Sequence, residues 1–88
     1  MAMTVEQANA LHTSAEVLIS AAELAASMFL PGSGAVVALI DKGVRGILAA
    51  IEANTHDFTV EERDVASATS RAILARLEGV PVPAPPEA

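Results

Sequence analysis

The tetrapeptide Pro31-Gly32-Ser33-Gly34 interrupts a long apolar run and constrains the fold more than any other feature of the sequence. Proline disfavours helical geometry at the preceding residue and cannot continue the hydrogen-bond ladder of a helix. Glycine supplies the positive φ values that a tight turn requires. We therefore predict a turn at Pro31, Gly32 and Gly34 that joins two helices into a hairpin.

Two other interpretations of this stretch fit less well. A membrane-spanning helix needs about 20 apolar residues, whereas the uncharged run from Leu24 to Ile40 has 17 residues and contains the turn. The apolar arms remain compatible with a shallow re-entrant hairpin. The two glycines match part of the phosphate-binding pattern G-x-G-x-x-G, but Val37 occupies the third position and no Gly-Lys-Ser/Thr follows.

The segment before the turn predicts an amphipathic helix over about 5–29. Thr4 and Gln7 have the spacing of a capping box, which satisfies two backbone donors that the first turn leaves free. Apolar residues then recur at steps of three and four and define one stripe: Ala8, Leu11, Ala15, Leu18, Ala22, Ala25 and Phe29. This sustained repeat favours a coiled-coil-like seam. We expect His12 to border the polar stripe of the same helix.

A second helix is predicted over about 35–53. Its seam positions carry only β-branched residues: Val37, Ile40, Val44, Ile47 and Ile51. Gly43 and Gly46 lie beside them, and a glycine inside a helix costs about 1 kcal/mol relative to alanine. The pair therefore predicts that another backbone passes close to this helix. Asp41 and Arg45, four residues apart, are expected to form an ion pair.

A third, shorter helix is predicted over about 60–78. Thr59 and Glu62 repeat the capping-box spacing, and Gly79 stands where a left-handed C-terminal cap belongs. Its apolar residues form two weak lines, namely Val65, Ala68, Ala72 and Ala75, and Ala66, Ile73 and Leu77. We expect this helix to cover the hairpin or a neighbouring subunit. The helices form one domain over 1–79, followed by a proline-rich, extended or disordered tail over 80–88.

The apolar composition predicts that an all-α fold of this kind packs as an oligomeric bundle. Nineteen of the 88 residues are alanine, two are phenylalanine, and there is no tryptophan or tyrosine. Alanine removes little surface from water, whereas a large apolar side chain contributes about 1.5–3 kcal/mol when buried. Small domains already bury the smallest fraction of their surface, so we expect self-association to supply the apolar burial that one copy lacks.

Charge and cysteine content exclude several classes of function. The net charge is −6, no cluster of basic residues is present, and aromatic residues for base stacking are lacking, so nucleic-acid binding is not expected. The chain has no cysteine and therefore no disulfide or thiolate metal site. The N-terminus lacks the pattern of a secretory signal peptide. We expect a cytoplasmic or virion-associated protein.

The sequence predicts no catalytic, metal-binding or cofactor-binding site. His56 and Asp57 lack a third ligand, and Glu61, Glu62 and Asp64 fit the positive end of a helix dipole. None of the candidate nucleophilic hydroxyls is expected beside a histidine: Ser14, Ser20, Ser27, Ser67 and Ser70. Pro83-Ala84-Pro85-Pro86 matches the loose P-x-x-P pattern without a flanking cation, which favours a terminal linker.

The order of these segments resembles a known group of proteins. An alanine-rich and glutamate-rich first helix, the Leu-Pro-Gly-Ser-Gly turn, an apolar helix containing Asp-Lys-Gly-Val-Arg, and the helix start Thr-Val-Glu-Glu-Arg follow one another over residues 12–78. This pattern resembles short, uncharacterised helical proteins of tailed bacteriophages. The resemblance implies a virion or accessory component and assigns no functional residues.

Three functional hypotheses follow from the sequence. The first is a non-enzymatic assembly protein that forms a homo-oligomeric helical bundle. The second is a membrane-active, holin-like or pore-forming hairpin, favoured by the apolar arms and the small residues Gly43 and Gly46. The third is a small acidic adaptor or inhibitor that binds a basic protein partner, for instance a host protein.

Overall fold

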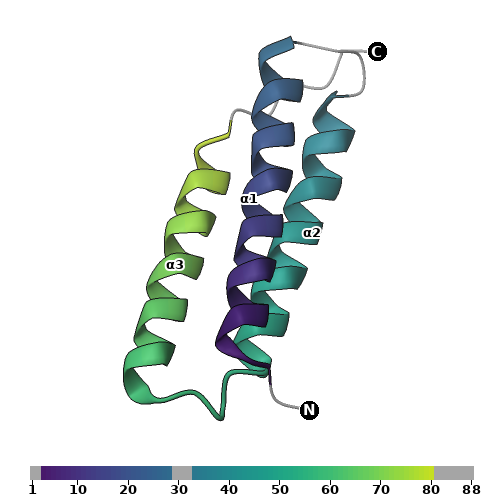
Figure 1. The fold of residues 1–88 in the computed structure, drawn as a ribbon. Coiled ribbons are helices and arrows are strands. Elements are labelled where there is room, and N and C mark those ends of the chain that lie inside the picture. The colour runs from purple at the N-terminus through teal and green to yellow at the C-terminus, as the bar shows by residue number, and fades with distance from the viewer. Residues whose placement is uncertain (1–2, 29–32, 81–88) are drawn as a thin grey trace.

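The computed structural model describes residues 3–28 and 33–80, and this part of the chain folds into three α-helices without a strand (Figure 1). The helices are α1 (Val5–Met28), α2 (Ser33–Ala53) and α3 (Val60–Glu78). The all-helical class is confirmed. Successive helices run antiparallel and form an elongated body of 51 × 21 × 16 Å.

The start of α2 differs from the prediction. The helix begins at Ser33, two residues earlier than expected, so Gly34 lies in its first turn and not in the turn before it. Glycine adopts helical and turn geometry equally readily, and the sequence pattern alone does not fix such a boundary. The predicted seam residue Phe29 and the turn residues Pro31 and Gly32 lie outside the described residues.

Both capping boxes predicted from the sequence are confirmed. The backbone N–H of Gln7 donates to Oγ1 of Thr4 at 3.1 Å, and the N–H of Thr4 donates to Oε1 of Gln7 at 3.0 Å. At α3, the reciprocal bonds between Thr59 and Glu62 measure 3.0 and 3.2 Å. These pairs satisfy backbone donors at both helix starts and fix where the helices begin.

The predicted left-handed cap at Gly79 is wrong. Gly79 has φ −79° and ψ −7°, which is right-handed geometry, and its N–H donates to the carbonyls of Ala75 and Arg76 at 3.2 Å. The chain therefore leaves α3 without a reversal and places Val80 in the core, where 7% of the residue is exposed. The packed domain extends past residue 79, the last residue assigned to it from the sequence.

α1 lies between the other two helices and packs most extensively against α2. Its buried line differs from the predicted stripe and consists of Ala8, His12, Ala15, Ile19, Ala22 and Ala26. Leu11 and Leu18, predicted at the centre of the seam, are only partly buried. The reason is that α1 contacts two helices and not one, so its buried direction is rotated toward α3.

α2 and α3 bury only some of the apolar residues that the sequence predicts in their buried faces. In α2, Val37, Val44 and Ile51 are buried, whereas Ile40 and Ile47 are partly buried at the edge of the core. In α3, the buried side chains are Ile73 and Leu77, which belong to the second of the two predicted lines. The first line, which begins at Val65, faces outward along its length.

Candidate functional site

The α1–α2 hairpin presents an uncharged face on the side away from α3. Contacts between Glu23 of α1 and Arg76 of α3 mark the side of α1 that faces α3, and helical periodicity puts the face on the opposite side. We term this surface the hairpin face. Its members are Ser14, Val17, Leu18, Ala21, Ala25 and Met28 from α1, and Val36, Leu39, Gly43, Gly46, Ile47 and Ala50 from α2.

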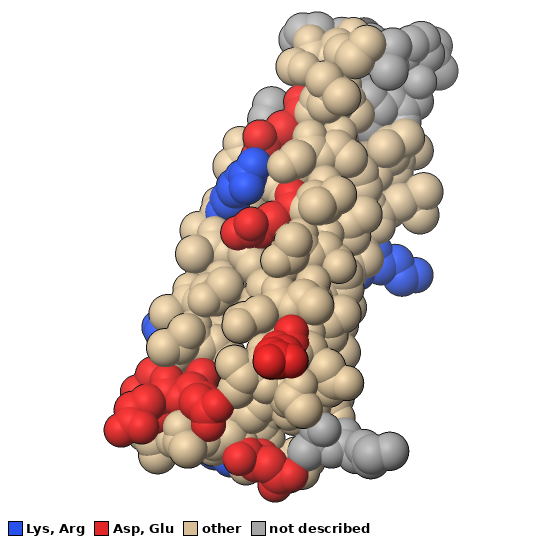
Figure 2. Space-filling view, in the orientation of Figure 1, with Lys and Arg blue, Asp and Glu red and all other residues tan. Residues whose placement is uncertain are grey.

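Large apolar side chains on the hairpin face are open to solvent. Four of the eight large hydrophobic residues that are exposed in the described part of the chain lie on it: Val17, Met28, Val36 and Leu39. Leu39 is the most exposed of these, at 71%. In Figure 2, the upper surface over α1 and α2 is largely tan, most charged side chains lie toward α3 or the lower end of the molecule, and one Lys or Arg side chain projects from the edge on the α2 side. The hairpin face therefore has the character of an interaction surface, and not that of a solvated helix face.

Gly43 and Gly46 of α2 lie on the hairpin face, and among the described residues no other backbone lies close to them. A methyl group added to Gly43 would lie 3.7 Å from Cδ1 of Leu18, which is ordinary van der Waals contact. A methyl group added to Gly46 would meet no atom within 4 Å. The predicted close approach of another backbone is therefore not made within this chain, because α1 meets α2 through the Leu18 side chain.

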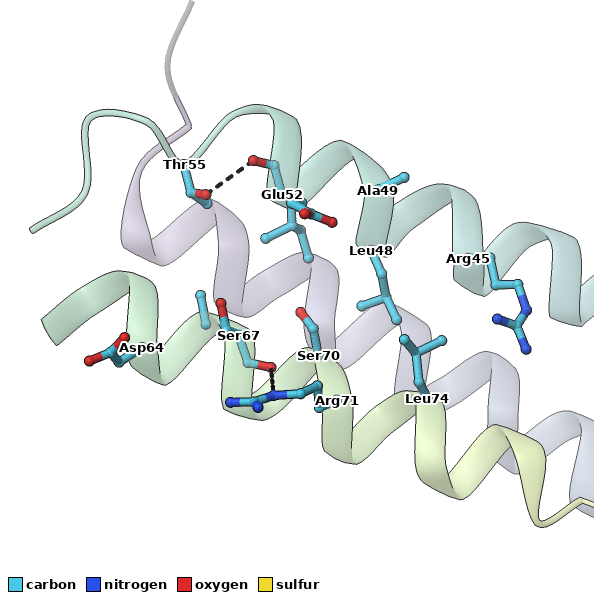
Figure 3. A pocket seen from close by; sticks show the side chains of 12 residues that line it. Arg45, Leu48, Ala49, Glu52, Thr55, Asp64, Ser67, Ser70, Arg71 and Leu74 are labelled. Atoms are coloured by element: carbon cyan, nitrogen blue, oxygen red, sulfur yellow. Dashed lines mark hydrogen bonds between the residues drawn. The ribbon is translucent and has the colours of Figure 1, made fainter. Parts of the chain in front are cut away.

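A second surface feature is a groove between α2 and α3 with a volume of about 690 Å³ (Figure 3). It exists because these two helices contact each other least. Leu48 and Leu74 point toward each other across it. Ser70 lies one turn before Leu74 on α3. Charged residues of both signs line the groove, namely Arg45, Glu52, Asp64 and Arg71. Arg45 also forms the predicted ion pair with Asp41 at 2.9 Å.

A buried polar pair joins α1 to α3. Nε2 of His12 lies 2.9 Å from Oγ of Ser70, and only 5% of His12 is exposed. Two predictions are wrong here, because His12 belongs to the buried line of α1 and a serine lies directly beside it. Burial lowers the pKa of His12 from its ordinary value of 6.5, since desolvation disfavours the imidazolium, and the negative charge of Glu16 partly offsets this effect.

The His12–Ser70 pair lacks the third member of a nucleophilic site. An activated serine needs a histidine whose other ring nitrogen is held by an orienting group. Among the described residues, Nδ1 of His12 is buried and has no hydrogen-bond partner. The pair therefore acts as a tether between two helices, and the orphaned nitrogen makes that tether sensitive to substitution and to pH.

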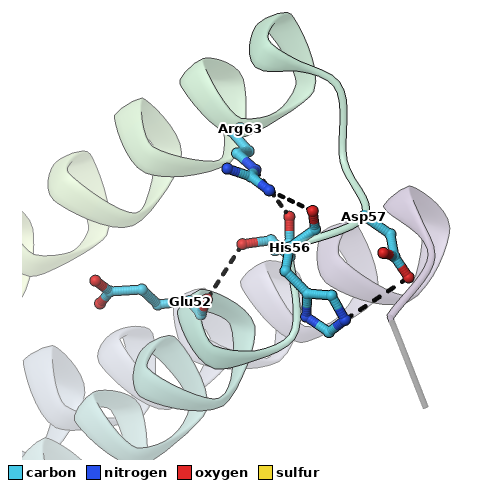
Figure 4. Close-up of polar contacts among 5 residues, drawn as sticks. Glu52, His56, Asp57 and Arg63 are labelled. Atoms are coloured by element: carbon cyan, nitrogen blue, oxygen red, sulfur yellow. Dashed lines mark hydrogen bonds and ion pairs between the residues drawn. The ribbon is translucent and has the colours of Figure 1, made fainter.

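The loop between α2 and α3 is held by an arginine that the sequence did not single out. Nε of Arg63 donates to the carbonyl of Thr55 at 3.1 Å, and its Nη2 donates to the carbonyl of His56 (Figure 4). Nε2 of His56 lies 3.7 Å from Oδ2 of Asp57, and both side chains are largely exposed. Across residues 3–28 and 33–80, no cluster of three or more His, Asp or Glu side chains could hold a metal ion.

An exposed ion pair also ties α1 to α3. Nε of Arg76 donates to Oε1 of Glu23 at 2.8 Å, and its Nη2 lies 3.4 Å from Oγ of Ser20. The bond to Glu23 raises the pKa of Arg76. Because both side chains are about half exposed, solvent screens this pair, and it contributes little to stability.

Comparisons with known proteins identify no relative of this chain. No family model, curated protein or solved structure matches it. Within the part of the chain that the structure describes, none of the helices has the length and apolar character needed to cross a bilayer.

Proposed function

We propose that this chain is a non-enzymatic structural or assembly protein that forms a homo-oligomeric helical bundle. The observation that carries the proposal is the imbalance between a small core and the apolar side chains outside it. Within residues 3–28 and 33–80, four of the twelve buried hydrophobic residues are alanines, and the three largest fully buried side chains are only Ile19, Ile51 and Val44.

The apolar side chains left outside the core supply the driving force for assembly. Eight large hydrophobic residues of the described chain are more than a third exposed. Full burial of one such side chain contributes about 1.5–3 kcal/mol, a substantial fraction of the 5–15 kcal/mol that stabilises a typical domain. A neighbouring copy that covered several of them would offset the weakness of the alanine-rich core.

Within this proposal, the assembly is a virion or accessory component of a bacteriophage. The support for that role is the resemblance of residues 12–78 to short helical phage proteins. An elongated body of 51 × 21 × 16 Å, with helices that run along its length, suits side-by-side packing into a larger bundle.

The native mass tests the proposal. Sedimentation equilibrium at micromolar concentrations is expected to give a mass above the 9.0 kDa of one chain, and that mass should fall on dilution. Circular dichroism on the same samples reports whether the chain is folded. A cooperatively folded monomer over the whole concentration range would overturn the proposal, because the core would then suffice by itself.

A further inference from the structure

We propose that a second copy of this chain covers the hairpin face, and that α2 packs against α2 of the partner subunit at Gly43 and Gly46. This inference rests on the proposed homo-oligomer, because its occupant is another copy. It adds the surface through which copies meet, the helix at the centre of the contact, and an expected strength of association.

The distribution of charge favours this surface for self-association. Each copy carries a net charge of −6, so two copies repel each other wherever their acidic sides meet. The hairpin face carries no charged residue, so pairing face to face brings no like charges into contact. A strongly charged partner would find no counterpart on this face, and an anionic lipid surface would repel the acidic chain.

The size of the hairpin face fits a dimer of moderate strength. Its residues span about 21 Å along each helix at 1.5 Å per residue, and two packed helices are together about 20 Å wide. The face therefore offers roughly 400–500 Å² per copy, or roughly 800–1,000 Å² in a symmetric pair, at the lower end of specific protein interfaces. We expect dissociation in the micromolar range.

The glycines identify where the two helices come closest. Neither Gly43 nor Gly46 is required by packing within the chain, because an added methyl group has room at both positions. Glycine nevertheless weakens a helix at each position relative to alanine. Small residues on an exposed apolar face allow two helix backbones to approach more closely than the usual 8–10 Å. In a two-fold symmetric dimer, the same two glycines of each copy would form this close contact.

The decisive variant is Gly46→Leu, because folding and association should change in opposite directions. Leucine favours the helix, and a β-carbon at this position meets no atom within 4 Å in the isolated chain, so the folding equilibrium constant should rise about fivefold. The same side chain would separate the two α2 helices, so the association constant should fall at least tenfold. Sedimentation gives the association constant, and urea unfolding of dilute, monomeric protein gives the folding constant.

Two further variants complete the experiment. Ala38→Leu adds a leucine to an exposed position of α2 outside the hairpin face, and association should be unchanged. Leu39→Asp places a charge on the hairpin face at a side chain that is 71% exposed, so the fold should persist while the pair dissociates. Leu39→Asp decides the question if Gly46→Leu disturbs folding.

The outcomes separate this inference from the proposed function. If the wild type is oligomeric and neither Gly46→Leu nor Leu39→Asp weakens association, the hairpin face is not the interface, and the proposed oligomer stands. A folded wild-type monomer overturns both. A monomer that floats with lipid vesicles likewise overturns both and assigns the hairpin face to lipid.

Discussion

Replacement of Ser70 by alanine tests whether the buried tether between α1 and α3 stabilises the fold. Ser70 is the only hydrogen-bond partner that the described residues offer to the His12 ring, and its Oγ lies 2.9 Å from Nε2. Nδ1 of the same ring already lacks a partner. The variant would therefore leave a buried imidazole with no hydrogen bond at either nitrogen.

The expected loss of stability follows from two opposing contributions. An unsatisfied buried polar group costs about 1–3 kcal/mol. Alanine is the better helix former, and its gain over serine in α3 is about 0.5 kcal/mol. We expect the free energy of unfolding to fall by roughly 0.5–2.5 kcal/mol at pH 8, where the neutral ring predominates in both states.

Urea unfolding followed by circular dichroism measures this difference at a fixed protein concentration. Ser67→Ala is the matched control, because Ser67 is exposed on the same helix and only its backbone carbonyl, not its hydroxyl, takes part in a side-chain hydrogen bond among the described residues. Ser67→Ala should show only the propensity gain. The double variant His12→Leu/Ser70→Ala should recover most of the loss, since no orphaned nitrogen remains. The reasoning is refuted if Ser70→Ala is as stable as Ser67→Ala.

Three further predictions concern pH, the core and the loop. Because burial lowers the pKa of His12, the unfolded chain binds more protons below about pH 6.5. Stability should therefore fall as the pH drops from about 7.5 to about 5.5, with a smaller slope in His12→Leu, as urea midpoints at each pH would show. Ile19→Ala should cost about 2–5 kcal/mol in thermal or urea unfolding, because Ile19 is 0% exposed; a loss below 1 kcal/mol would contradict the assigned core. Arg63→Ala should cost about 1 kcal/mol and accelerate hydrogen exchange at Phe58, whose N–H donates to Thr55, whereas unchanged exchange would show that Arg63 does not hold the loop.

The helices were predictable because their signals are local. The capping pairs at Thr4 and Thr59 lie within three residues of their partners, and they place the starts of α1 and α3 correctly. The end of α3 at Glu78 follows from the proline that comes three residues later. The start of α2 was missed by two residues, since Ser33 and Gly34 suit a turn and a helix start equally well.

The contacts between helices were not predictable in the same way. His12 and Ser70 are separated by 58 residues, and the angle at which α3 meets α1 decides whether they touch. One signal was present, because His12 lies four residues after Ala8 and three before Ala15, in step with the alanines of α1. Taking the alanines as the centre of the buried line would have placed His12 inside the bundle.

The rotation of the buried side of α1 toward α3 also affects which apolar side chains are left for assembly. Alanines occupy the centre of its buried line and allow α2 and α3 to approach, whereas the bulkier Leu11 and Leu18 lie at the rim. Leu18 buries only part of its surface in this chain and leaves the rest on the hairpin face. The described part of the chain therefore buries eight valine, isoleucine and leucine residues in its own core and places further large apolar side chains on the hairpin face, where a second copy would cover them. This distribution, and not the count of alanines alone, is the physical reason to expect that the free energy of folding and the free energy of association are coupled.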